Sequence, residues 1–148
     1  MTAAYPSPRA LLEKYGLRAK KSWGQNFLGD EGILDDIARL AAPRAGDPVV
    51  ELGAGLGHLT ARLLARGARV VAVERDRDMA EVLRGELGER IVLLEADAAR
   101  LDYGELLARY APPPGPDEQV QDQDQDQGQD QDQDQDQGQD QGQGQGQG

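Results

Sequence analysis

The sequence contains no cysteine and a single histidine, so it offers neither a disulfide framework nor a thiolate or histidine-rich metal site. It also lacks the run of about 18 consecutive apolar residues that a membrane-spanning helix needs. The N-terminus has no basic stretch followed by an apolar one, as a signal peptide would. These absences predict a soluble, cytoplasmic protein without a metal site or a membrane partner.

Basic residues are absent from the last part of the chain. All 16 lysines and arginines lie in residues 1–116, together with 17 of the 27 acidic residues, whereas residues 117–148 hold the other 10 acidic residues. The formal net charge of −11 therefore belongs almost entirely to the tail. It does not argue against a nucleic-acid partner for the rest of the chain.

The tail is also poor in apolar residues. Residues 112–116 are four prolines and a glycine, and the sequence from Gln119 onward is nearly all glutamine, aspartate and glycine. Such a segment cannot bury enough apolar surface to offset the cost of ordering its backbone, about 1–2 kcal/mol per residue. We therefore predict that residues 112–148 form a disordered, low-complexity tail.

Residues 47–111 alternate between short aliphatic stretches and amphipathic ones. Strands are predicted over residues 49–52, 69–74 and 91–95, and helices over residues 56–65, 76–87 and 101–110. Continuous aliphatic strands that alternate with helices are typical of a parallel sheet covered on both faces. With the right-handed crossover rule, the pattern predicts the α/β class and a doubly wound, Rossmann-like sheet.

Residues 1–46 form a basic N-terminal region with two predicted helices. Ser7 and Asp30 are suitable N-cap residues, and Gly16 and Pro43 suit the two helix ends. The residues expected on the buried face of the second helix are Ile33, Leu34, Ile37, Ala38 and Ala41. The apolar residues between the two helices follow neither a helical nor a strand periodicity, which predicts an ordered loop.

The strongest local signal is the glycine-rich stretch ELGAGLG, residues 51–57, between a predicted strand and a predicted helix. Glycines allow a tight turn and a close approach of the backbone to a ligand, and the helix start offers unpaired N–H groups. The spacing G-x-G-x-G differs from the dinucleotide fingerprint G-x-G-x-x-G, and Glu51 would repel a pyrophosphate. The arrangement suits a cationic ligand tail, such as the amino-acid part of S-adenosylmethionine. The predicted cofactor-binding residues here are Glu51, Gly53, Gly55 and Gly57; a glycine-rich turn without a ligand is the alternative.

Acidic residues follow the next two predicted strands. Glu74 ends the second strand, 21 residues after Gly53, where a ribose-binding carboxylate lies in folds of this class. Asp97 and Ala98 follow the third strand, and ligands of such sheets lie outside the carboxyl ends of the strands. We therefore predict that Glu74 binds a ribose diol and Asp97 an adenine amino group. The alternatives are a solvated ion pair of Glu74 with a neighbouring arginine and a helix cap for Asp97.

Residues 9–21 contain five basic residues and one acidic residue, and Trp23 and Phe27 follow closely. Basic side chains contact phosphates and aromatic rings stack on bases, so Arg18, Lys20 and Lys21 are predicted to bind RNA. In the alternative, the aromatic residues are buried, which we favour for Phe27, and the charges are solvated.

The stretches KSWGQNFL (residues 21–28), ELGAGLGHLT (51–60) and VERD (73–76) resemble the ribosomal RNA adenine dimethyltransferases. The GQNFL block is the most discriminating, because generic methyltransferases lack it. The resemblance covers residues 9 to about 110 and implies an S-adenosylmethionine-dependent, Rossmann-like methyltransferase fold. It also implies methylation of two adjacent adenines in small-subunit ribosomal RNA, free or in a pre-ribosomal particle. We expect such a protein to be a monomer.

The resemblance also assigns roles to individual positions. The matching residues are Gln25, Asn26 and Leu28 in the segment that folds over the cofactor, Gly53 in the loop around its methionine part, Glu74 at the ribose and Asp97 at the adenine. His58 has no role in the family pattern, so we expect it on the surface of its helix.

The family's target-base motif, Asn-Leu/Ile-Pro-Tyr at the end of the fourth strand, does not occur in this sequence. That motif positions the adenine whose amino group attacks the methyl group in line. We therefore expect a truncated fold, limited to the cofactor-binding half, with no catalytic residue and with the first strand, residues 49–52, as an exposed edge. A non-catalytic RNA-binding or ribosome-assembly module is the alternative. An NAD-dependent oxidoreductase is disfavoured by the glycine spacing and by the GQNFL block.

Overall fold

The computed structural model describes residues 4–21 and 30–110, and the structural statements below concern these residues. The predictions for Gln25, Asn26, Leu28 and the low-complexity tail lie outside them. The chain divides into two units, residues 1–113 and 114–148, and every described residue belongs to the first. Within the described ranges, no helix is long and apolar enough to cross a membrane.

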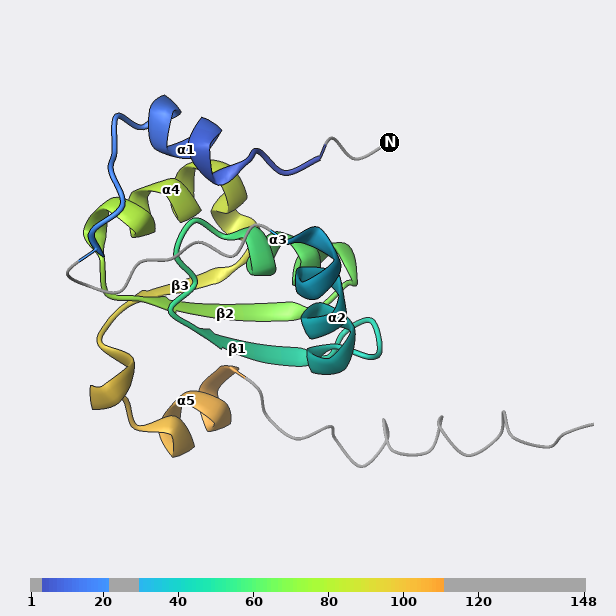
Figure 1. The fold of residues 1–148 in the computed structure, drawn as a ribbon. Coiled ribbons are helices and arrows are strands. Elements are labelled where there is room, and N and C mark those ends of the chain that lie inside the picture. The colour runs from blue at the N-terminus through green and yellow to red at the C-terminus, as the bar shows by residue number, and fades with distance from the viewer. Residues whose placement is uncertain (1–3, 22–29, 111–148) are drawn as a thin grey trace, which may run out of the picture. The chain divides into compact units, whose positions relative to one another are not determined.

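Three parallel strands form the sheet, in the order β1-β2-β3 (Figure 1). Their bounds are Pro48–Leu52 for β1, Arg69–Glu74 for β2 and Val92–Glu95 for β3. Leu52 pairs with Val73 and Glu74 pairs with Glu95, so the strands end together at one rim of the sheet. The predicted parallel sheet is confirmed, and β1 and β3 each differ from their predicted bounds by a single residue at the start.

Helices lie on both sides of the sheet, as the alternation of strands and helices predicted. Their bounds are Pro8–Lys14 for α1, Glu31–Ala41 for α2, His58–Ala65 for α3, Arg77–Leu87 for α4 and Tyr103–Tyr110 for α5. Two 3₁₀ turns, Gly88–Arg90 and Ala98–Arg100, precede and follow β3. In Figure 1, α3 and α4 cover one face of the sheet, α5 lies on the other, and α1 lies outside α4.

Local sequence determines where most helices begin. Ser7, Asp30 and Asp76 cap α1, α2 and α4, because the side chain of each accepts a hydrogen bond from a backbone N–H of the first turn, at 3.0–3.2 Å. The helix α3 instead follows Gly57 with no side-chain cap, two residues later than predicted.

Two clusters of buried side chains make the core. The larger one joins α2, α3 and α4 to one face of β2, and its members include Ala38, Leu63, Ala72, Leu83 and Leu87. The smaller one consists of Leu11, Leu56, Met79 and Val82. It packs α1 against α4 and includes a residue of the glycine-rich turn, so the N-terminal region is part of the same body as the turn.

The buried face of α2 is narrower than predicted. Leu34 and Ala38 are buried, but Ile33, Ile37 and Ala41 are exposed. The reason is that α2 packs along one edge against α3, so only the row of residues four apart faces the core. The prediction for those three residues was therefore wrong.

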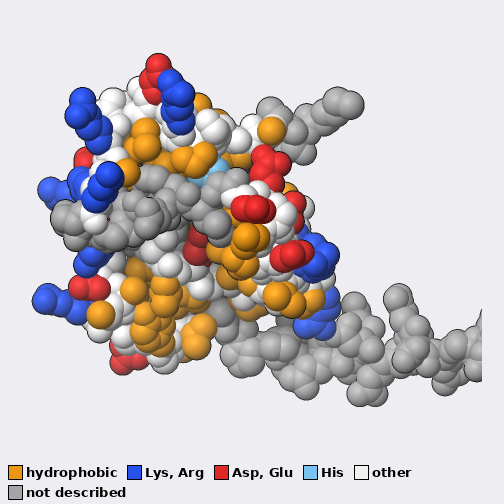
Figure 2. All heavy atoms as spheres, in the orientation of Figure 1, with side chains coloured by type: hydrophobic (Ala, Val, Ile, Leu, Met, Phe, Trp, Pro, Cys, Tyr) orange, Lys and Arg blue, Asp and Glu red, His pale blue; other side chains and the backbone are white. Residues whose placement is uncertain are grey.

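Part of the apolar surface is uncovered. Within the described ranges β1 has a partner strand on one side alone, and Leu52 at its end is 51% exposed, as expected for an edge strand. Val92, Tyr103 and Leu107 near α5 are also exposed. Figure 2 shows hydrophobic side chains gathered over α5 and the adjoining sheet face, and again over α2.

Candidate functional site

The glycine-rich turn takes a backbone path that only glycine adopts easily. Gly53, Gly55 and Gly57 have φ angles of 72°, 58° and 88°, in the left-handed region. The N–H groups of Gly53 and Ala54 both donate to the carbonyl of Val73, at 2.8 and 3.3 Å. The turn is therefore folded back onto the end of β2.

The glycines of the turn face different surroundings. A Cβ atom added to Gly57 would lie 2.8 Å from the hydroxyl of Tyr5 and 2.9 Å from a methyl group of Leu83, so this position is closed on all sides. A Cβ atom added to Gly53 would meet no atom of residues 4–21 or 30–110 within 4 Å. Among the described residues, the backbone at Gly53 is therefore open, and its role in binding a ligand stays a prediction.

Glu74 joins the turn to the start of α4. One carboxylate oxygen accepts the N–H of Gly55 at 2.7 Å, and the other accepts the N–H of Asp76 at 2.9 Å. The side chain is 7% exposed, so it is not the solvated charge of the alternative reading. Each carboxylate oxygen can accept two hydrogen bonds. Both oxygens therefore keep capacity for a further donor, such as the hydroxyls of a diol.

Glu51 lies behind the turn and is 8% exposed. Burial and, to a smaller degree, the negative charge of Glu74 raise the pKa of its carboxyl, and the hydrogen bond from the Thr60 hydroxyl (2.6 Å) lowers it. The net result is a pKa of about 7. A carboxyl with this pKa exchanges its proton near neutral pH, and a neighbouring cation would favour its ionised form.

A hollow of about 210 Å³ opens beside the turn. Its walls are Leu34 and Ile37 of α2, Glu51 and the glycine-rich turn, and His58 and Leu59 of α3. Apolar walls with one acidic group suit a small organic molecule that carries a positive charge. Glu74 and Asp97 are not among the residues that line it.

Asp97 lies at the same rim of the sheet, beyond the hollow. The N–H of Ala96 donates to the carbonyl of Glu74 at 3.2 Å, so the ends of β2 and β3 are directly linked. The carboxylate of Asp97 accepts the N–H of Ala99 at 3.0 Å and thereby caps the 3₁₀ turn Ala98–Arg100. This is the capping role that the sequence analysis gave as the alternative to adenine binding. Ala98 is partly buried, and its carbonyl accepts the Tyr103 hydroxyl at 2.6 Å. The adenine role of Asp97 stays a prediction.

Tyr5 and His58 also belong to this region, although the sequence analysis did not select them. The Tyr5 hydroxyl donates to the carbonyl of Leu56 at 2.7 Å, and Nε2 of His58 lies 2.7 Å from the carbonyl of Pro6. The two rings meet edge to face, 5.1 Å apart. The prediction of a surface position for His58 was wrong, because the segment before α1 covers it. Burial lowers its pKa. No local pattern links positions so far apart in the sequence.

The predicted RNA-binding residues have different surroundings. Arg18 and Lys21 are exposed, whereas Lys20 forms ion pairs with Asp76 and Asp78, at 2.9 and 2.8 Å. Figure 2 shows lysines and arginines gathered at the edge where Figure 1 places the ends of the strands. The other exposed arginines that follow a strand end are Arg75, Arg77 and Arg100.

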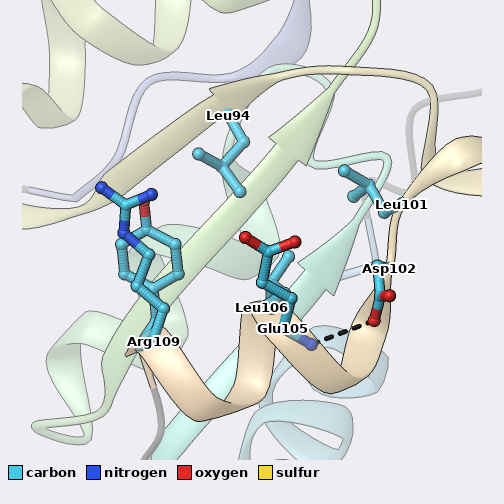
Figure 3. A pocket seen from close by; sticks show the side chains of 7 residues that line it. Leu94, Leu101, Asp102, Glu105, Leu106 and Arg109 are labelled. Atoms are coloured by element: carbon cyan, nitrogen blue, oxygen red, sulfur yellow. Dashed lines mark hydrogen bonds between the residues drawn. The ribbon is translucent and has the colours of Figure 1, made fainter.

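A second hollow of about 190 Å³ lies between β3 and α5 (Figure 3). Leu94 of β3 points toward Glu105 and Leu106 of α5, and Arg109 stands at its side. The Asp102 carboxylate caps α5 through the N–H of Glu105, at 3.0 Å. None of the predicted cofactor residues that the structure describes lines this hollow, so we assign it to packing between α5 and the sheet.

Comparisons with known proteins give a consistent result. The sequence matches the family described as ribosomal RNA adenine dimethylase over residues 16–136. It is 83% identical over 113 residues to ribosomal RNA small subunit methyltransferase A of Anaeromyxobacter dehalogenans, and 56% identical over 100 residues to the protein of the same name in Myxococcus xanthus. These alignments cover 76% and 68% of this chain, but 40% and 35% of the relatives. The chain thus spans about two fifths of the length of the relatives that it matches.

A solved structure agrees on the fold. The chain is similar to a candidate RNA methyltransferase from Pyrococcus horikoshii, with a TM-score of 0.50 and 24% sequence identity over 64% of this chain and 54% of that one. At this level of identity the likeness concerns the fold alone.

Proposed function

Because the chain belongs to the ribosomal RNA adenine dimethylase family, we propose that its described body binds S-adenosylmethionine. We propose further that it serves methyl transfer to the amino groups of adjacent adenines in small-subunit ribosomal RNA. The names of the relatives support the RNA substrate. The proposal depends above all on the buried Glu74 carboxylate, which accepts the N–H groups of Gly55 and Asp76 at the carboxyl rim of the sheet.

The residues at the rim fit the parts of this cofactor. Glu74 can accept the two ribose hydroxyls with its remaining lone pairs, and the open backbone at Gly53 lets a ligand approach closely. Glu51, in the wall of the hollow, can stay ionised beside the ammonium group of the amino-acid part. We assign Asp97 and Ala98 to the adenine end, and Gln25, Asn26 and Leu28 to the segment that closes over the cofactor.

The chain's contribution to the reaction is positioning. When bound, the cofactor supplies an activated methyl group on its sulfonium. Glu51, Glu74 and the glycine-rich turn hold the two ends of the ligand, so that the methyl group has one place and one direction. We assign contacts with RNA phosphates to exposed basic residues, with Arg18 and Lys21 among them.

The same basic rim supports a second function from another class, a non-catalytic RNA-binding or ribosome-assembly module. The two functions differ in one measurable property, because only the first requires S-adenosylmethionine to bind. RNA binding that is sensitive to salt, without any cofactor binding, would favour the second.

Isothermal titration of the full chain with S-adenosylmethionine tests the proposal. We expect binding to a single site, and we expect Glu74→Gln to weaken it at least about tenfold, because a hydrogen bond to a charged group contributes about 1.5–3 kcal/mol. Glu95→Gln is the matched control. Glu95 pairs with Glu74 in the sheet register but is exposed, so its variant should bind as the parent does. A folded parent chain that binds no S-adenosylmethionine would refute the proposal.

A further inference from the structure

An unbroken series of polar contacts leads from Lys20 to the glycine-rich turn. The Lys20 ammonium lies 2.9 Å from the Asp76 carboxylate and 2.8 Å from the Asp78 carboxylate. The N–H of Asp76 donates to one oxygen of Glu74, and the other oxygen of Glu74 accepts the N–H of Gly55. Three hydrogen bonds thus separate the lysine from the backbone of the turn.

The charges at this site explain why a lysine belongs there. Asp76 is 1% exposed, and its carboxylate also caps α4 through the N–H of Asp78. A buried carboxylate needs a compensating partner, since its desolvation is costly. The contacts with Asp78 and Asp76 raise the pKa of Lys20, which keeps the ammonium charged. A phosphate that bound Lys20 would have to compete with two carboxylates already in place.

The same lysine lies at a junction of the chain. Residues 4–20 are docked on α4, where Leu11 packs against Met79 and Val82. Lys20 directly precedes the stretch KSWGQNFL, residues 21–28. The contact with Asp76 therefore ties the end of this docked region to the turn between β2 and α4.

We propose that Lys20 is a positioning residue for the cofactor rather than a contact for RNA. Through Asp76 it fixes the backbone N–H that binds Glu74, and through Glu74 it holds the glycine-rich turn. The identity of the ligand rests on the proposed function above, whereas the network itself does not depend on it.

The test compares Lys20→Met with Lys14→Met in the full chain. Lys14 is a matched control, because it lies in the same docked region and forms an ion pair with Glu86, in the last turn of α4 and away from Glu74. We expect Lys20→Met to raise the Kd for S-adenosylmethionine about fivefold or more, at the lower end of the coupling between linked sites. We expect Lys14→Met to change it less than twofold, and Lys20→Arg to bind as the parent does.

Hydrogen exchange without ligand gives a second readout. In Lys20→Met the amides of residues 53–57 should exchange faster than in the parent, and in Lys14→Met they should not. If the parent chain binds no S-adenosylmethionine, the proposed function fails, but the exchange rates still decide whether Lys20 holds the turn. If Lys20→Met does not fold, Asp78→Asn removes one of the two ion pairs at a more exposed residue, and it should have the same effects to a smaller degree.

Binding to purified small-subunit ribosomal RNA at several salt concentrations distinguishes positioning from RNA contact. Loss of a phosphate contact lowers the slope of log K against log salt concentration by about 1. We expect this change for Lys21→Met and an unchanged slope for Lys20→Met. A lower slope for Lys20→Met, with the cofactor affinity and exchange rates of the parent, would overturn the inference.

Discussion

The rim of the sheet around the glycine-rich turn and the face covered by α5 are built in different ways. At the rim, buried carboxylates bind backbone N–H groups and a hydroxyl at 2.6–2.9 Å. At the α5 face, three leucines and the flexible side chains of Glu105 and Arg109 line an open hollow, and Tyr103 and Leu107 remain exposed. Hydrogen bonds have preferred distances and directions, whereas apolar contacts do not. The rim can therefore hold a few atoms in fixed positions, which a ligand site requires, and the α5 face cannot.

The largest effect that would separate the two regions is expected from Gly57→Ala. The left-handed backbone at this position costs a residue with a Cβ atom about 1–2 kcal/mol, and the contacts with Tyr5 and Leu83 add about 1–3 kcal/mol. We expect the free energy of unfolding, measured in urea, to fall by about 3 kcal/mol or more.

The matched change at the α5 face is Gly104→Ala. Gly104 lies in the first turn of α5, where alanine is favoured over glycine, but an added Cβ atom would lie 3.3 Å from Oδ1 of Asp102. The two effects oppose each other, so we expect the stability of this variant to differ from that of the parent by less than about 1 kcal/mol. Equal losses in both variants would show that the rim is no more tightly packed than the α5 face.

The second effect concerns pH. The folded-state pKa of Glu51 is raised from 4.5 to about 7, so the folded chain binds more protons than the unfolded chain between these values. The contribution of Glu51 to stability therefore falls as the pH rises from 4.5 to 7. Glu51→Gln should remove this decrease, and its advantage over the parent should reach about 3 kcal/mol above pH 7. Urea unfolding from pH 5 to pH 8 measures it.

The control for the pH effect is Glu105→Gln, at an exposed residue of α5 that borders the hollow toward β3. Its stability should follow the pH dependence of the parent. Glu51→Gln should also weaken S-adenosylmethionine binding more at pH 8 than at pH 6, because a larger fraction of the parent carboxyl is ionised at the higher pH. Binding that increases equally with pH in both chains would point to another group, such as His58.

The smallest effect is expected from Tyr5→Phe, which removes the hydroxyl that donates to the Leu56 carbonyl. Loss of one hydrogen bond costs about 1 kcal/mol, and we expect this loss in the free energy of unfolding together with a few-fold weaker affinity for S-adenosylmethionine. Tyr103→Phe removes a comparable bond near α5, to the Ala98 carbonyl, at an exposed residue. Tyr103→Phe should lose less stability and no affinity, and the reverse order would contradict the assignment of Tyr5 to the site.

The strands, the helices and the N-caps of α1 and α2 could be predicted because they depend on neighbouring residues. Aliphatic runs gave β1, β2 and β3 to within one residue, and Ser7 and Asp30 begin their helices as expected. The glycine-rich turn and Glu74 could be predicted for the same reason, since each stands at the end of a recognisable strand.

The errors arose where a contact joins distant segments. His58 is covered by Tyr5 and Pro6, and Ile33 and Ile37 are exposed because α2 packs by a single edge. Lys20 is one of several basic residues in the sequence, and only its ion pairs with Asp76 and Asp78 set it apart.

By itself, the sequence determined the α/β class, the order of the elements, the family and the residue types at the strand ends, because hydrophobic period, capping and glycine spacing act over a few residues. The tertiary structure alone decided which carboxylates are buried, which N–H groups they accept and which lysine is tied to them. Those properties depend on how the chain brings separate segments together, such as Glu74 and Gly55, 19 positions apart, and Lys20 and Asp76, 56 positions apart, and no local pattern encodes them.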